Sequence, residues 1–186
     1  MRNLDRQLRN ILSADTGCLA ALRCVRALCL PQGAIGAGLI RSAVWSRIAG
    51  RPAAAADTAD IDVLYLDRSD TSRQAEEAIE RRLQAMAPAL PWSVRNQARM
   101  HLRNGDEPYQ SLEDALRYWL ETPTCVAVRI DLSDRLEVIA PFGLDDLFAM
   151  RIRPTPRGRQ RAADYRSRIE TKGWETQWPQ AVIELP

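Results

Sequence analysis

The sequence predicts an α+β fold, with a small mixed β-sheet flanked by helices and helical extensions at both ends of the chain. Two observations carry this prediction. Residues 59–66 form a strand-like run that is apolar on both faces beyond Asp62, which is typical of a central, buried strand. On both sides of this run, apolar residues recur every three or four positions, which is the spacing of amphipathic helices.

The chain length of 186 residues fits a single domain. We expect this domain (1–186) to consist of a helical N-terminal extension, a core and a basic C-terminal extension, at residues 1–30, 31–150 and 151–186.

The N-terminal third predicts two helices followed by a strand-to-helix turn. Helices at residues 3–12 and 16–30 follow from their apolar spacing, and the second must stop before Pro31. Residues 34–38 are predicted to form a short strand that turns sharply into another helix, because small residues permit such a turn. A loop at residues 51–58 then leads to the central strand.

The middle of the chain predicts a capped helix and another strand. Asp70, Thr71 or Ser72 can cap a helix whose apolar residues keep helical spacing until about Pro88. Residues 92–101 then have the pattern of a strand.

The next segment predicts a helix and a hairpin. Ser111 is followed three positions later by an acidic residue, the pattern of a capping box, and the helix that it opens extends to Thr122. Residues 125–130 and 136–139 flank a polar turn and predict a β-hairpin.

The C-terminal extension is basic. A short helix is predicted to open at Asp145, and a longer one to run from about residue 159 to residue 172. Residues 151–172 carry eight basic and two acidic side chains, although the whole chain has a net charge of only +2. Such a patch can attract RNA or the phosphates of a nucleotide. A solvated basic helix that faces acidic neighbours explains it equally well.

Composition excludes several classes of protein. The most apolar early stretch, residues 18–30, is interrupted by Arg23 and Arg26, so it fits neither a membrane span nor a signal-peptide core. We therefore expect a cytoplasmic protein without a membrane partner. Lys172 is the only lysine, which argues against Schiff-base chemistry and against a P-loop.

The candidate catalytic residues are Asp60 and Asp62. Because strand side chains alternate between faces, these two carboxylates would project from the same face and can share magnesium. Metal-bound carboxylates are the usual means of in-line phosphoryl or nucleotidyl displacement. An acidic pair at the start of a strand can also be a solvated edge or a turn. The apolar strand that follows favours a site, because charge at the end of a buried strand is costly without a compensating partner.

Together with Gly36 and Gly38, this pattern resembles the polymerase-beta-type nucleotidyltransferase superfamily, in which a glycine pair opens a helix and Asp-x-Asp lies on the next strand. More closely, the chain is similar to a family of small bacterial nucleotidyltransferases. The blocks that carry this resemblance are residues 36–41, 60–63, 96–101, 108–109, 140–148 and 153–156.

The resemblance implies a polymerase-beta-type nucleotidyltransferase fold and transfer of a nucleoside monophosphate from a nucleoside triphosphate to a hydroxyl acceptor. It implies that Asp60 and Asp62 hold magnesium, and that Gly36 and Gly38 let the triphosphate approach the helix N-terminus. A tight turn without a ligand would also explain the glycines. Arg41 is expected to reach a phosphate, although a surface ion pair would explain it too.

Asn96 is expected to face the base or the sugar of the nucleotide. The superfamily usually places a third carboxylate on the strand after the Asp-x-Asp helix, where this chain has Asn96 and Gln97 instead. The alternative candidates for that carboxylate are Asp131, Glu137, Asp145 and Asp146. Two further hypotheses therefore remain beside the transferase: a nucleotide-binding or regulatory module without catalysis, and an RNA-associated protein.

Overall fold

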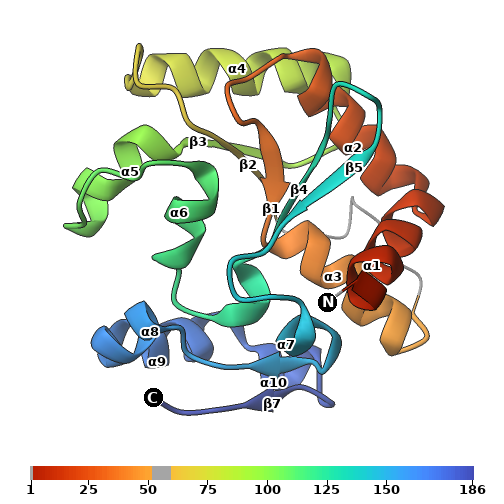
Figure 1. The fold of residues 1–186 in the computed structure, drawn as a ribbon, viewed down its shortest axis with the longest axis vertical. Helices are drawn as coiled ribbons and strands as arrows, with labels where there is room; N and C mark the ends of the chain where they lie inside the picture. Colours follow the sequence, from red (N-terminus) through yellow and green to blue (C-terminus); the bar gives the residue numbers. More distant parts are fainter. Residues whose placement is uncertain (1, 52–59) are drawn as a thin grey trace.

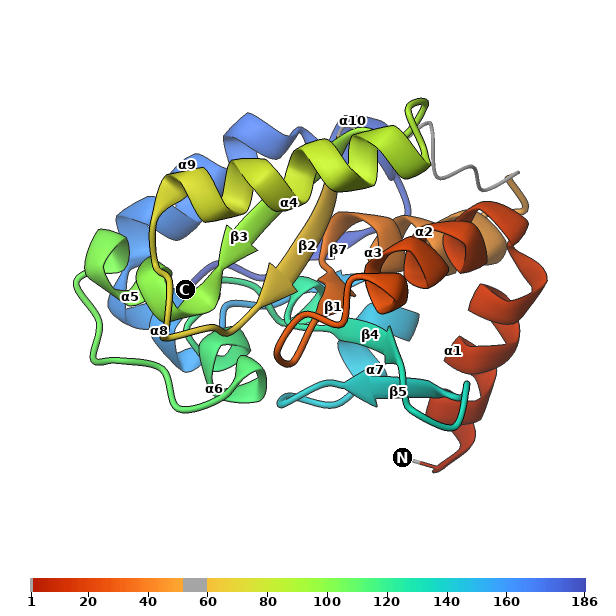
Figure 2. The same ribbon diagram turned by 90° about the horizontal axis from the view of Figure 1, so that it is seen from above.

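The computed structural model describes residues 2–51 and 60–186. The predicted loop at 51–58 lies outside the described residues except for Arg51. Figures 1 and 2 show a central sheet with helices around it. No helix in the described part of the chain is long and apolar enough to cross a membrane.

The central sheet has five strands in the order β3-β2-β1-β4-β5. Strands β2 and β3 are parallel, and the other neighbours are antiparallel, so the sheet is mixed as predicted. The strands are β1 (Ala34–Gly36), β2 (Ile61–Tyr65), β3 (Trp92–Asn96), β4 (Ala127–Ile130) and β5 (Leu136–Ile139). A separate parallel pair joins β6 (Arg151–Ile152) to β7 (Val182–Ile183).

The helices follow the predicted alternation with the strands. They are α1 (Arg2–Ala14), α2 (Thr16–Ala27), α3 (Gly38–Ile48), α4 (Arg73–Met86), α5 (Gln97–Asn104), α6 (Leu112–Arg117), the 3-10 helix η2 (Thr122–Thr124), α7 (Asp145–Phe148), α8 (Pro156–Gln160), α9 (Ala162–Lys172) and α10 (Trp174–Gln177). The predicted caps of α4 and α6 are confirmed: Ser72 Oγ accepts a hydrogen bond from the N–H of Ala75, and Ser111 Oγ accepts one from the N–H of Asp114.

The register of the sheet defines its two ends. Ile35 of β1 lies opposite Val63 of β2 in an antiparallel pair, so β1 ends where β2 begins. We call this the glycine–aspartate end, because Gly36, Asp60 and Asp62 lie there. The turn between β4 and β5 lies at the opposite end, which we call the hairpin end.

Different helices cover the two faces of the sheet. Val63 and Ile35 belong to the large core cluster, which includes residues of α1, α2, α3 and α4. In Figure 2, α4 lies over β2 and β3, and α2 lies beside β1 and β4. On the face that Leu64 shares with Asp62, a smaller cluster includes Leu112 and Leu116 of α6.

The C-terminal extension lies at the bottom of the view in Figure 1, and α4 lies at the top. Tyr165, Trp174 and Trp178 of the extension belong to the same core cluster as Val63. The extension is therefore packed onto the core. This contact allows its side chains to reach the glycine–aspartate end.

Several predicted elements differ from the structure. The helix predicted at 16–30 ends at Ala27, and the helix predicted to extend to Thr122 ends at Arg117. The strand predicted at residues 92–101 ends at Asn96, and α5 begins at Gln97. The reason is that the Asn96 side chain accepts a hydrogen bond from the N–H of Ala98 and so caps α5. The helix predicted at 159–172 is broken at Arg161, whose φ of −111° and ψ of 52° are not helical.

Candidate functional site

The aspartate pair lies at the start of a buried strand. Asp60 directly precedes β2 and Asp62 is the second residue of that strand, so both side chains are on the same face. Burial, together with the neighbouring charge of Asp60, raises the pKa of Asp62 to about 6. Two carboxylates are thus held together where water screens them poorly, an arrangement that favours a bound cation.

The turn between β1 and α3 is strained. Ala37 has a φ of +48° and a ψ of −112°, a conformation that costs free energy for any residue other than glycine. Its N–H donates to the carbonyl of Val126 at 3.1 Å, which holds the turn against β4. None of the side chains that the structure describes caps α3. The N–H groups of its first turn therefore remain available to an anion.

The two glycines of this turn have different physical reasons. A Cβ atom on Gly36 would lie 2.7 Å from Cδ1 of Leu64 and 3.6 Å from the ring of Trp119. Packing against these side chains is a sufficient reason for glycine at this position. Gly38 is the first residue of α3, where a small residue leaves the helix N-terminus accessible.

Arg41 is a buried cation whose hydrogen-bonding capacity is not fully used. Its exposed fraction is only 9%, and its Cζ atom lies 5.3 Å from the ring centre of Trp45 and 5.5 Å from that of Trp174. One Nη donates to Ser42 Oγ at 3.3 Å, while the buried Nε has no partner among the described residues. Burial lowers the pKa of Arg41 to about 10. An anionic ligand would supply the partner that this guanidinium lacks.

The sequence did not identify two charged residues, Glu121 and Arg168, as candidates for the site. Glu121, with an exposed fraction of 1%, precedes η2, and its Oε1 accepts from Nε of Arg168 on α9 at 2.5 Å. The negative charge of Glu121 raises the pKa of Arg41 and partly offsets the effect of burial. The charges of Asp60 and Asp62 act in the same direction but more weakly. Glu121 and Arg168 are far apart in the sequence, and no spacing pattern connects them.

Most of the basic C-terminal patch is neutralised within the protein. Five of its arginines form ion pairs: Arg151 with Glu184, Arg153 with Asp146 and Glu184, Arg157 with Asp106, Arg161 with Asp164, and Arg168 with Glu121. This pairing agrees with the simpler interpretation of the patch, a basic segment that faces acidic neighbours. It weakens the hypothesis of an RNA-associated protein.

Asn96 lies away from the aspartates. It is opposite Tyr65 in the parallel register, at the far end of β2, whereas Ser93 is opposite Asp62. Its side-chain oxygen accepts from the N–H groups of Asp67 and Ala98, and its nitrogen donates to the carbonyls of Asp67 and Asp70. With these four bonds, the amide has no free donor or acceptor for a base or a sugar, so its role is structural.

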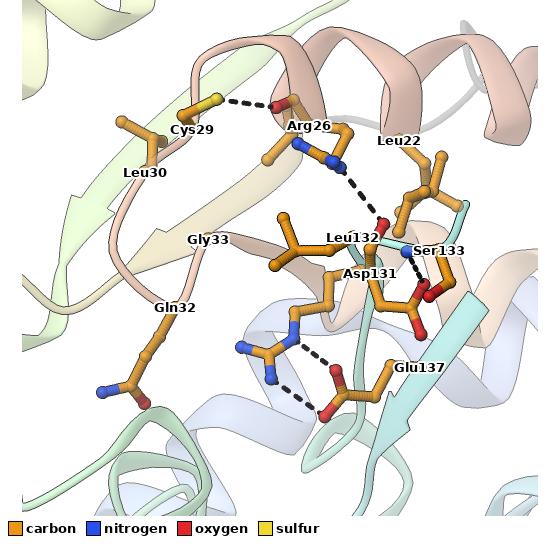
Figure 3. Close-up of a pocket in the computed structure, with 13 residues that line it drawn as sticks. Leu22, Arg26, Cys29, Leu30, Gln32, Gly33, Asp131, Leu132, Ser133 and Glu137 are labelled. Atoms are coloured by element: carbon orange, nitrogen blue, oxygen red, sulfur yellow. Dashed lines mark hydrogen bonds and ion pairs between the residues drawn. The ribbon is translucent and has the colours of Figure 1, made fainter. Parts of the chain in front are cut away.

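The alternative third carboxylates are also used elsewhere. Asp131 and Glu137 line a cavity of about 520 Å³ at the hairpin end of the sheet (Figure 3). Glu137 pairs with Arg129 at 2.7 Å, and Asp131 with Arg135 at 3.1 Å. Asp146 accepts from Thr122 and pairs with Arg153, and Asp145 opens α7.

Within residues 2–51 and 60–186, no group of three or more His, Cys, Asp or Glu side chains is arranged to hold a metal ion. Among these residues, no third acidic side chain therefore joins Asp60 and Asp62 as a metal ligand.

Known proteins agree with this architecture. Residues 23–183 match a protein family described as nucleotidyltransferase, and the chain belongs to that family. An NMR structure described as revealing a CCA-adding enzyme head domain is similar with a TM-score of 0.87 and 26% sequence identity, covering 97% of this chain and 96% of that chain. The predicted family and fold class are thus confirmed.

A longer protein shares the fold as well. The complex of a CCA-adding enzyme with CTP is similar with a TM-score of 0.55 and 14% identity, covering 99% of this chain but only 41% of that one. At this level of identity the likeness concerns the fold alone. No curated protein matches the chain.

Proposed function

We propose that this protein binds a nucleoside triphosphate with magnesium and transfers the nucleoside monophosphate to a hydroxyl acceptor. The observation that carries the proposal is the buried guanidinium of Arg41, which has a donor without a partner among the described residues and whose pKa is raised, against the effect of burial, by the charges of Asp60 and Asp62. Folding alone gives no reason to bury these charges together without complete pairing, whereas a metal-bound triphosphate would complement both signs.

The donor set fits magnesium. Mg²⁺ prefers hard oxygen ligands and is commonly bound through one or two carboxylates together with substrate phosphates. Asp60 and Asp62 would provide these carboxylates. A cation would offset both the burial of Asp62 and its repulsion by Asp60, which together raise its pKa. When bound, the metal would neutralise charge on the phosphates during displacement.

The chain's own residues would position the nucleotide. Arg41 would donate to phosphate oxygens, and the uncapped N-terminus of α3 would present N–H groups to them. Gly38 would keep the approach to that terminus free of a side chain, and Gly36 would let the turn pack against Leu64. Orientation and charge neutralisation would then supply most of the rate enhancement.

One observation favours a second function. Because no third carboxylate joins the pair among the described residues, only Asp60 and Asp62 are carboxylates placed to accept the proton of a hydroxyl. A protein of this kind could bind the nucleotide and act as a regulatory module without transferring it. Binding is common to both functions, and release of pyrophosphate distinguishes them.

The test is thermal stabilisation by each of the four nucleoside triphosphates with and without magnesium, since a ligand that binds the folded state raises apparent stability. Asp62→Asn should abolish the magnesium-dependent rise. Asp134→Asn is the matched control, because Asp134 is exposed at the hairpin turn and its φ of +57° suits asparagine. No stabilisation of the wild type by any nucleotide would refute both functions.

Pyrophosphate release is then measured with RNA 3′ ends, small alcohols and protein hydroxyls as acceptors. Release that requires Asp62 would support the transferase. Magnesium-dependent binding without release on any acceptor would favour the regulatory module.

A further inference from the structure

We propose that α9 completes the triphosphate site, with Arg168 and Lys172 joining Arg41 in a cationic cluster that binds the terminal phosphates of the nucleotide. This inference rests on the proposed function and assigns part of the binding site to the C-terminal extension. A triphosphate carries more negative charge than a single Mg²⁺ neutralises. Further cations beside the aspartate pair therefore have a clear use.

The position of Arg168 is fixed by a buried partner. Glu121 has almost no exposed surface, and its carboxylate accepts from Nε of Arg168 at 2.5 Å. Such a charge-assisted contact restricts the guanidinium strongly. Because this contact uses Nε and the structure describes no other hydrogen bond of Arg168, the two Nη groups remain donors for a ligand. Glu121 thereby acts as a positioning residue for Arg168.

Lys172 lies on the same face of α9 as Arg168. The two residues are four positions apart, which places their side chains next to each other on a helix. The rotation of the helix is set by Tyr165, whose buried hydroxyl donates to the carbonyl of Glu184 at 2.8 Å and lies 3.1 Å from that of Ile152. Lys172 itself is exposed, so its ammonium group is free to move toward a ligand.

A second contact joins the extension to the site. Trp174 begins α10 directly after Gly173, and its ring covers the guanidinium of Arg41 at 5.5 Å. Arg41 is thus held between a tryptophan of α3 and a tryptophan of the C-terminal extension. The end of α9 and the start of α10 therefore adjoin the phosphate-binding residue of the core.

The electrostatics of the aspartate pair agree with this placement. The positive charges of Lys172 and Arg168 oppose the rise in the pKa of Asp62, and Arg168 helps to lower the pKa of Arg41. Arg41 and Arg168 thus repel each other in the folded protein. A bound polyanion would relieve this repulsion, and the relief would favour binding.

A purely structural role for this part of α9 explains less. Neutralising Glu121 requires Arg168 alone, and it explains neither the unpartnered Nε of Arg41 nor the cation one helical turn further along the same face. The proposed cluster accounts for both.

The experiment measures binding of inorganic tripolyphosphate, without metal, to the full chain at low salt by calorimetry. Lys172→Gln should weaken binding roughly tenfold, because a charge-assisted hydrogen bond to phosphate is lost. Arg168→Met is combined with Glu121→Gln so that no buried carboxylate is left unpaired, and it should also weaken binding roughly tenfold or more. Arg166→Gln is the control, because Arg166 is exposed on α9 and lies two positions from Arg168.

Wild-type binding that is weakened by both changes, but not by Arg166→Gln, would support the cluster. Unchanged binding in both variants, or no binding of tripolyphosphate to the wild type, would overturn it. The proposed function is judged separately from magnesium-dependent nucleotide binding and its loss in Asp62→Asn. Nucleotide binding that requires Asp62 but not Lys172 would therefore leave the function standing and remove this inference.

Discussion

The two ends of the central sheet differ in whether their charged side chains are paired. At the hairpin end, Glu137 pairs with Arg129 and Asp131 with Arg135, and these charges are satisfied within the protein. At the glycine–aspartate end, Asp62 is half-buried, and the charge of Asp60 nearby helps to raise its pKa. The guanidinium of Arg41 there is also buried, and it retains an unpartnered donor.

The difference shows which end of the sheet is prepared for a ligand. The hairpin end has a cavity of about 520 Å³ (Figure 3), but Arg129 and Glu137 in its lining already pair with each other, and Asp131 pairs with Arg135. The glycine–aspartate end combines charges that are costly to bury with a strained backbone at Ala37. Unpaired charge therefore indicates the functional site better than the size of a cavity does.

The largest expected effect is on stability, from Asp62→Asn in metal-free protein. Replacement of Asp62 should stabilise the fold at neutral pH by about 1–3 kcal/mol, because its pKa is raised to about 6 from an ordinary value near 3.8. Well below pH 3.8 the residue is protonated in both states and has no effect. As the pH rises toward about 6, the unfolded chain loses the proton first and the wild type becomes less stable.

This comparison is measured by denaturant unfolding of both proteins in EDTA between pH 4 and pH 7. The stability of the variant should exceed that of the wild type increasingly over this range. A difference that is absent or independent of pH would show that the carboxylate pair is not strained.

A smaller effect is expected for Arg41→Met. Methionine can fill the space between Trp45 and Trp174, so stability should change by less than about 1 kcal/mol in spite of the lost cation–π contacts. Affinity for a magnesium–nucleotide complex should fall roughly tenfold, because a donor to phosphate is lost.

Calorimetry and thermal melting measure the two quantities, with Arg47→Met as the control on an exposed part of the same helix. Strong destabilisation with unchanged nucleotide affinity would make Arg41 a structural residue and would remove the contrast between the two ends.

The smallest effect is expected at the hairpin end. Glu137→Gln should reduce stability by less than about 1 kcal/mol, because Glu137 and Arg129 are partly exposed and solvent screens their attraction. Nucleotide binding should be unchanged, since the pair lies at the other end of the sheet. A loss of nucleotide affinity in this variant would mean that both ends of the sheet contribute to the site.

The elements that the sequence predicted correctly depend on local interactions. The caps at Ser72 and Ser111 act on N–H groups three residues away, and the β4–β5 hairpin depends on a short turn. The strand predicted at residues 92–101 failed at Asn96 because a side chain that looked like part of a strand instead caps a helix. Local chemistry decided that case too, although strand periodicity concealed it.

The sequence by itself determined the family pattern, the central strand with Asp60 and Asp62, and the glycine turn before α3, because each is encoded by residues close together in the chain. Only the tertiary structure decided that Arg41 is buried beneath Trp174, that Glu121 holds Arg168, and that Asn96 is fully bonded away from the aspartates. These outcomes depend on contacts between residues distant in sequence. For Arg41 and Glu121, the burial and electrostatic free energies arise only when the C-terminal extension packs onto the core.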